Sequence, residues 1–247
     1  MMPRILILRA PGTNCDAETA FAFQTAGGKP DVLHLNQLLE APQLAANYQV
    51  LCLPGGFSYG DDVAAGRIFA NQIRHHLGDV MREFRAAGKL ILGICNGFQV
   101  LIKSGLLAAN DSDSPVASLA WNDSHRYLDR WVELQSNGTR CVFLSGVESL
   151  FLPIAHAEGK FVARDEATLD QLDEAGQLPL RYLPDSNPNG SVRNVAGMCD
   201  ATGCVFGLMP HPERFIDPTQ HPQWTRLPAL EAGAGLQLFR NAVGYFS

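Results

Sequence analysis

The chain has 247 residues, of which 46% are hydrophobic and 18% are charged, and its formal net charge is −6. This composition excludes a disordered or fibrous protein, and the acidic balance disfavours a nucleic acid backbone as the main partner. No apolar run reaches the ~18–20 residues that a membrane-spanning helix needs. We therefore expect neither a nucleic acid nor a membrane among its partners.

The cysteines are scattered along the chain and form no CxxC pair, which indicates neither a disulfide framework nor a metal site. They are Cys15, Cys52, Cys95, Cys141, Cys199 and Cys204. The apolar run near the start breaks at Pro11-Gly12 and is too short for the core of a signal peptide. The simplest interpretation is a cytoplasmic protein that binds no metal.

Strand-like and helix-like segments alternate over the first hundred residues. The predicted strands are Arg4–Leu8, Val32–Leu35, Val50–Leu53 and Leu90–Ile94. The predicted helices are Asp16–Ala26 and an amphipathic stretch from Ile68 to near Gly88. This alternation predicts βαβ units and a parallel sheet, whose ligands bind at the carboxyl ends of the strands.

The second half changes to a pattern of antiparallel strands. The predicted strands are Tyr127–Leu134, Cys141–Leu144, Lys160–Val162, Leu180–Leu183, Val192–Met198 and Val205–Met209, with a turn at Asn137-Gly138. Helices are predicted at Glu166–Ala175 and Leu236–Phe246. We predict one α/β domain over residues 1–247, with a flavodoxin-like, mostly parallel central sheet, flanking helices and an inserted antiparallel β region.

Cys95 is the candidate nucleophile. The predicted strand Leu90–Ile94 runs directly into Gly93-Ile94-Cys95-Asn96-Gly97 and then into an apolar, helix-like stretch. A sharp turn there would lift the thiol above the sheet at a helix N-terminus, whose dipole favours the thiolate. A merely buried cysteine would not need glycine on both sides.

His211 is the candidate base, because it directly follows the predicted strand Val205–Met209. Pro210 and Pro212 flank it and are expected to block a helix or a further strand. Glu213 would then project from the same extended stretch and orient the imidazole. A third element is the glycine-rich segment Leu53–Asp61, in which Gly56 and its neighbours are expected to complete an oxyanion hole with the N–H of Asn96.

These segments resemble the class I (triad) glutamine amidotransferases. Gly93–Gln99 matches the G-x-C-x-G-x-Q signature of that family, His211-Pro212-Glu213 its second signature and Pro54-Gly55-Gly56 its oxyanion loop. Further segments resemble the glutaminase subunits of phosphoribosylformylglycinamidine synthase, the PurQ type. They are RAPGTNCD at Arg9–Asp16, PGGFSYGDD at Pro54–Asp62, AHAEGKF at Ala155–Phe161, NPNGS at Asn187–Ser191 and GLMPHPERF at Gly207–Phe215.

The resemblance implies that Cys95 attacks the side-chain amide of glutamine, that His211 acts as base and then acid, and that Glu213 orients it. The implied substrate-binding residues are Gly55, Gly56, Phe57, Asn96, Gln99, His156, Ala157 and Glu158.

The resemblance also implies partners. The ammonia would pass to a large ATP- and Mg-dependent synthetase subunit of the PurL type, with a small accessory subunit of the PurS type. That enzyme converts formylglycinamide ribonucleotide to formylglycinamidine ribonucleotide in purine biosynthesis. The chain itself has no phosphate-binding G-x-x-x-x-G-K-[ST] motif, so we expect no cofactor here.

Three alternatives stay open on the sequence alone. A DJ-1/PfpI-like cysteine hydrolase also places its cysteine on an elbow, but it lacks a late His-Pro-Glu segment. A non-enzymatic binding subunit would not need Cys95, His211 and Glu213 together. A glutaminase that serves a different acceptor, as in GMP or CTP synthesis, is disfavoured only by the subfamily segments.

Overall fold

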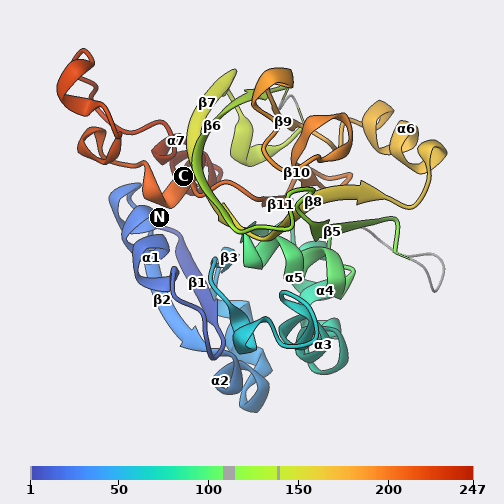
Figure 1. The fold of residues 1–247 in the computed structure, drawn as a ribbon. Coiled ribbons are helices and arrows are strands. Elements are labelled where there is room, and N and C mark those ends of the chain that lie inside the picture. Colours follow the sequence, from blue (N-terminus) through green and yellow to red (C-terminus); the bar gives the residue numbers. More distant parts are fainter. Residues whose placement is uncertain (1, 108–114, 138–139, 247) are drawn as a thin grey trace.

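The computed structural model describes residues 2–107, 115–137 and 140–246, in which two sheets are flanked by helices (Figure 1). The strands are β1 (Arg4–Arg9), β2 (Lys29–His34), β3 (Val50–Leu53), β4 (Leu90–Ile94), β5 (Ala117–Trp121), β6 (Leu128–Ser136), β7 (Ser149–His156), β8 (Glu158–Ala163), β9 (Leu180–Tyr182), β10 (Val195–Cys199) and β11 (Val205–Leu208). The helices are α1 (Asp16–Thr25), α2 (Leu35–Glu40), α3 (Arg67–His76), α4 (Gly78–Ala86), α5 (Asn96–Ser104), α6 (Glu166–Glu174) and α7 (Leu236–Gly244).

The larger sheet has the strand order β2-β1-β3-β4-β11-β10-β9-β6-β7 within these residues. From β2 to β11 neighbouring strands run parallel, and every residue of β3, β4 and β11 is buried. Strands buried on both faces read as continuous apolar runs, which is why the sequence predicts them well. From β11 to β7 the neighbours are antiparallel. The predicted fold class is confirmed, and the antiparallel strands extend the same sheet.

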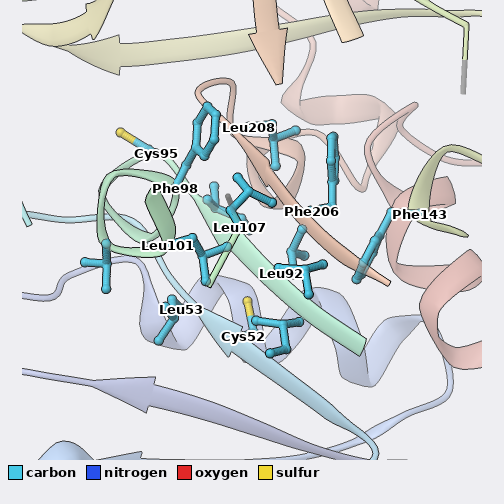
Figure 2. Packing of buried hydrophobic residues seen from close by; sticks show 14 of the residues in the cluster. Cys52, Leu53, Leu92, Cys95, Phe98, Leu101, Leu107, Phe143, Phe206 and Leu208 are labelled. Atoms are coloured by element: carbon cyan, nitrogen blue, oxygen red, sulfur yellow. The ribbon is translucent and has the colours of Figure 1, made fainter. Parts of the chain in front are cut away.

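Helices cover both faces of the parallel half (Figure 1). On one face α1 packs against α7, where the rings of Phe23 and Phe239 meet edge to face with centroids 4.9 Å apart. On the other face α3 packs against α5. Figure 2 shows the core beneath α5, where Phe98 and Leu101 pack toward Leu92 and Phe206 of the adjacent strands β4 and β11. No helix in the described ranges combines the length and the apolar character that crossing a membrane requires.

Two elements of the first half differ from the prediction. The single helix expected from Ile68 to near Gly88 is two helices, because the backbone leaves the helical conformation at Leu77, just before Gly78. Glycine disfavours a helix interior, while the buried Leu77 keeps the apolar spacing running across the break. The second strand starts at Lys29 instead of Val32, and Leu35 already begins α2.

The second half holds the larger errors. Cys141–Leu144 is not a strand, since Val142–Leu144 form a 3-10 helix. The segment Val192–Met198 likewise begins with a 3-10 helix, Val192–Asn194, before β10 starts. Short apolar runs do not reveal their period, so they suit either structure. The expected turn at Asn137-Gly138 lies partly outside the described residues. Strands β5 and β7 were not predicted.

Candidate active site

Cys95 occupies the sharp turn that joins β4 to α5. Its backbone has φ 51° and ψ −103°, a strained region for any residue that carries a side chain. The amide of Cys95 donates a hydrogen bond of 2.8 Å to the carbonyl of Leu208, and its own carbonyl accepts from the amides of Phe98 and Gln99. The turn directs Cys95 Sγ away from the packed core (Figure 2).

Two glycines make this turn possible. A Cβ on Gly97 would lie 1.9 Å from the carbonyl oxygen of Leu53, and a Cβ on Gly93 would lie 2.6 Å from the carbonyl oxygen of Gly97. Backbone atoms cannot rotate away as a flexible side chain can, so both positions require glycine in this conformation. The Gly-x-Cys-x-Gly spacing is therefore a packing requirement of the turn.

His211 arrives at the same edge of the sheet because β11 lies parallel to β4, with Leu208 opposite Ile94. Its amide donates a hydrogen bond of 2.8 Å to the carbonyl of Pro153 on β7. Its Nδ1 lies 2.6 Å from Glu213 Oε1. Strand register therefore brings the base to the level of the nucleophile, and β7 holds its backbone.

The expected extended stretch after His211 is wrong. Pro212–Arg214 form one turn of 3-10 helix, with Pro212 at the first position. A proline is tolerated there because its missing N–H would have no partner within the turn. The turn places Glu213 beside the imidazole, so the carboxylate reaches His211 through a helical step.

The side chains of His211 and Glu213 are both buried. Burial acts to lower the pKa of His211, but the negative charge of Glu213, and then that of Cys95, outweighs it and holds this pKa well above its usual value. Because Nδ1 faces the carboxylate, Nε2 is the nitrogen left to exchange a proton. It has no hydrogen-bond partner among the described residues.

A cavity of about 70 Å³ is lined by both Cys95 and His211. The loop after β3 closes it, since Gly56 and Phe57 also line this cavity. Gly55 lies behind them, where an added Cβ would come within 2.8 Å of His211 Cε1. The predicted oxyanion loop thus borders the cavity that Cys95 and His211 share, and its Gly55 packs against His211.

A larger cavity, of about 190 Å³, also reaches Cys95. Most of the predicted substrate-binding residues line it, namely Gly56, Phe57, Gln99, His156, Ala157 and Glu158. Gly55 and Asn96 line neither cavity. The two cavities share Gly56, Phe57, Cys95 and Ala155, so the nucleophile stands where they meet.

Asn96 connects the elements around the larger cavity by hydrogen bonds, although it does not line the cavity itself. Its Oδ1 accepts the amide of Ser58 at 3.3 Å, and its Nδ2 donates to Gln99 Oε1 at 2.9 Å. Gln99 Nε2 in turn donates to the carbonyl of Glu158 at 2.6 Å. These bonds link the loop after β3, helix α5 and the start of β8 around one space.

His156 is buried and carries no charge at neutral pH. Burial, reinforced by the charge of His211, lowers the pKa of His156 to about 3. Its Nδ1 lies 3.1 Å from Asn122 Oδ1, and Asn122 Nδ2 donates to the carbonyl of His156 at 2.9 Å. The residue therefore shapes the wall of the cavity without adding a cation.

Cys15 was not predicted as a site residue, although it lines the smaller cavity. Its Sγ accepts a hydrogen bond of 3.2 Å from Arg214 Nη2. Burial raises the pKa of the Cys15 thiol. Cys15, His211 and Glu213 each offer an atom that could bind a metal ion, and these three atoms lie within 4.8 Å of one another. The positive charge of Arg214, which donates to Cys15 Sγ, disfavours a metal ion there. The sequence signal was its place just after the first strand, at the same sheet edge.

Asp61 is the last residue of the predicted segment Leu53–Asp61, but no role at the site was predicted for it. It follows the oxyanion loop, lines the larger cavity and has a positive φ of 55°. Its Oδ1 accepts a hydrogen bond of 3.2 Å from Asn96 Nδ2.

Comparison with known proteins places the chain in a family. Residues 2–246 match the model of the CobB/CobQ-like glutamine amidotransferase domain. A protein of Dehalococcoides mccartyi named phosphoribosylformylglycinamidine synthase subunit PurQ is 43% identical to this chain, over 97% of this chain and 96% of that protein. A protein of the same name from Methanococcus maripaludis strain S2 is 40% identical, over 100% of this chain and 98% of that protein.

Solved structures show the same fold. A chain in the structure of PurLQS from Thermotoga maritima superimposes with a TM-score of 0.78 at 31% identity, over 100% of both chains. A glutamine amidotransferase from the same organism superimposes with a TM-score of 0.56 at 16% identity, over 91% of this chain and 81% of that one, which shows the fold alone. The family match, the relatives and the geometry around Cys95 agree with the resemblance of the motifs, and the chain belongs to the CobB/CobQ-like glutamine amidotransferase family.

Proposed function

We propose that this chain, as one domain over residues 1–247, is the glutaminase subunit of a phosphoribosylformylglycinamidine synthase. The observation that carries the proposal is the meeting of Cys95 with the His211–Glu213 pair beside a cavity of about 190 Å³. The names of the relatives support the acceptor reaction.

The first half-reaction forms a thioester. The Cys95 thiolate attacks the amide carbon of glutamine, and the resulting oxyanion faces the N–H groups of the loop at Gly56 and of Asn96. As the carbon–nitrogen bond breaks, the imidazolium of His211 gives its Nε2 proton to the leaving nitrogen. Ammonia departs, the γ-glutamyl group stays on the sulfur, and His211 is neutral.

The second half-reaction releases glutamate. Neutral His211 takes a proton from a water molecule, which attacks the thioester carbon. The carbon–sulfur bond then breaks, and the thiolate and the imidazolium are restored as a pair. Throughout both steps Glu213 keeps Nδ1 protonated and stabilises the positive charge of the ring.

We further propose that the ammonia is consumed by a separate synthetase subunit of the PurL type, together with a small subunit of the PurS type. The Thermotoga maritima assembly described as PurLQS supports this arrangement. ATP and magnesium would be used by the synthetase. The six cysteines form no disulfide, which suits the cytoplasm.

The test compares the complex of this chain and its cognate synthetase subunits with the same complex carrying Cys95→Ala. We expect the unaltered complex to make formylglycinamidine ribonucleotide from glutamine or from ammonium chloride. The variant complex should use ammonium chloride only, because it lacks the sulfur that attacks the amide. 6-Diazo-5-oxonorleucine should label the unaltered chain at Cys95, as measured by peptide mass.

Two outcomes would overturn the proposal. Equal use of glutamine by the Cys95→Ala complex would show that another chain releases the ammonia. Glutamine hydrolysis that persists unchanged in His211→Ala would favour a cysteine hydrolase of the DJ-1/PfpI type.

A further inference from the structure

Arg214 ends the 3-10 turn that carries Glu213, and its side chain reaches a different part of the fold. Its Nε donates a hydrogen bond of 3.0 Å to Glu18 Oε1, and its Nη2 donates one of 3.2 Å to Cys15 Sγ. Cys15 directly precedes α1, and Glu18 lies in the first turn of that helix. The planar guanidinium group therefore contacts the start of α1 at two points, which the compact ammonium group of a lysine could not do in the same way.

The carboxylate of Glu213 has few contacts of its own that fix its position. Its Oε1 lies 2.6 Å from His211 Nδ1, but its Oε2 is buried without a hydrogen-bond partner among the described residues. Of the three side chains in the turn, only that of Arg214 is hydrogen-bonded to a different element, within the part of the chain that the structure describes. The position of the carboxylate thus depends on how the turn is anchored, and Arg214 supplies the side-chain anchor.

The contacts of Arg214 continue through Cys15 to the loop after β3. The amide of Cys15 donates to the carbonyl of Gly55 at 3.3 Å. Gly55 in turn packs on the base, because a Cβ added to it would lie 2.8 Å from His211 Cε1 and 3.1 Å from Cys15 Sγ. The contacts therefore close a ring, which runs through His211, Glu213, Arg214, Cys15 and Gly55.

Arg214 lines the smaller cavity and not the larger one. A residue in this place acts on the base and not on the part of the substrate that fills the larger cavity. We propose that Arg214 is a positioning residue for the His211–Glu213 pair. Its bonds to Glu18 and Cys15 fix the turn, and the turn fixes the carboxylate that orients the imidazole. This inference rests on the proposed glutaminase activity.

Loss of the Arg214 side chain should leave the fold intact. The two side chains of its ion pair are 35% and 36% exposed, and ion pairs of this kind contribute little to stability. Backbone bonds also hold the chain on both sides of the turn. The amide of His211 donates to the carbonyl of Pro153 at 2.8 Å. The amide of Gly235 donates to the carbonyl of Phe215 at 2.8 Å.

The test measures glutamine hydrolysis by the assembled complex that carries Arg214→Ala, Glu18→Ala or both changes together. Arg9→Ala is the matched control, because Arg9 also pairs with α1, at 3.1 Å from Asp16 Oδ2, but lines neither cavity. Each complex is also assayed for synthesis of formylglycinamidine ribonucleotide from ammonium chloride. That activity does not need the glutaminase site, so it shows whether the complex is folded and assembled.

We expect Arg214→Ala to lower kcat for glutamine roughly 10–100-fold, because a displacement of about 1 Å in a catalytic group can cost about 10²-fold. KM should stay within about threefold, since Arg214 does not line the larger cavity. Glu18→Ala should lower kcat about 3–10-fold, and the double variant should be no worse than Arg214→Ala, because the two side chains act as one unit. Arg9→Ala and the activity with ammonium chloride should match the unaltered complex.

The outcomes separate this inference from the proposed function. If the unaltered complex releases no ammonia from glutamine, the proposed function fails and the inference fails with it. If it is active but Arg214→Ala raises KM alone, Arg214 serves substrate binding and the inference is wrong. Additive losses in the double variant, or an equal loss of the activity with ammonium chloride, would also overturn it. If Arg214→Ala does not fold, Glu18→Ala decides, because an unchanged kcat in that variant would contradict the positioning role.

Discussion

The carboxylate of Glu213 controls the charge of the His211 ring as well as its orientation. The imidazole is buried with only 2% of its surface exposed, and burial alone would favour the neutral ring. Glu213, at 2.6 Å from Nδ1, reverses that preference. The pair therefore decides the pH range in which an imidazolium is present beside Cys95.

Glu213→Gln should shift this range. Removing the negative charge lowers the pKa of His211, so the imidazolium is lost at a lower pH. The alkaline limb of the kcat/KM profile for glutamine should move to lower pH. The kcat should fall about 10²–10⁴-fold, as it does in other catalytic triads whose carboxylate residue is replaced. Glutamate release measured across pH checks both effects.

The control for that experiment is Glu231→Gln, the same change at an exposed position. It should leave the profile where it is. An alkaline limb that stays in place in Glu213→Gln would mean that the carboxylate does not control the charge of His211.

At this scale the sequence could indicate the triad but not all its neighbours. Cys95, His211 and Glu213 stand in short constrained segments whose chemistry is readable from their neighbours in the chain. Cys15 meets His211 only because the loop after β1 docks on the loop after β3, where the Cys15 amide donates to the carbonyl of Gly55 at 3.3 Å. Such a contact between loops leaves no pattern in the neighbouring residues, and only the place of Cys15 just after the first strand points to the site.

Helix α5 begins against the backbone of β3, and this contact determines where the nucleophile stands. Gly97, in the first turn of α5, lies where an added Cβ would be 1.9 Å from the carbonyl oxygen of Leu53. The helix can approach β3 this closely only without a side chain at that position.

Gly97→Ala should therefore force α5 away from β3. We expect it to lower the free energy of unfolding by about 3 kcal/mol or more, at the upper end for overpacking because no rotamer relieves a backbone contact. Glutaminase activity should fall with it, since Cys95 moves with the helix. Urea unfolding and ammonia release measure the two effects.

Gly244→Ala is the matched control, because Gly244 is also helical and an added Cβ would meet nothing within 4 Å. Its stability should be unchanged or higher by up to about 1 kcal/mol. If the two variants were equally stable, Gly97 would not be required for the close packing of α5 on β3.

Among the elements, strand β7 shows why sequence patterns fail at sheet edges. Its Pro153 argues against a strand in sequence, yet β7 is the last strand of the larger sheet, where a missing N–H on the outer side is tolerated. The carbonyl of the same Pro153 accepts the amide of His211. An element that the pattern disfavours thus supports the site.

The stability of the whole molecule rests on a core shared by both halves of the sheet. Phe206 on β11 is fully buried and stacks on Phe143, with ring centroids 5.9 Å apart (Figure 2). β11 separates the parallel strands from the antiparallel ones. A cavity at this place weakens the packing of both.

Phe206→Ala should lower the free energy of unfolding by about 3–5 kcal/mol. Phe21→Ala, the same change at a position that is 61% exposed, should change it by no more than about 0.5 kcal/mol. Urea denaturation of both variants provides the comparison. Similar midpoints for the two would contradict the central place of Phe206 in the core.

For the molecule as a whole, the parallel half follows from sequence because its buried strands are continuous apolar runs separated by helices. The antiparallel half does not, because the register between β9 and β10 is irregular and its strands do not all pair with their neighbours in the chain. β6, for example, pairs with both β7 and β9. No spacing in the chain indicates that choice.

The placement of Cys95 between two cavities of unequal size has a consequence for the order of events. On the proposed function, a glutamyl group bound to the sulfur would fill the larger cavity and block it. Ammonia, which is much smaller, would still have the smaller cavity beside His211 and Tyr127, with Arg214 at its wall. Glutamate and ammonia could therefore leave the site by different routes.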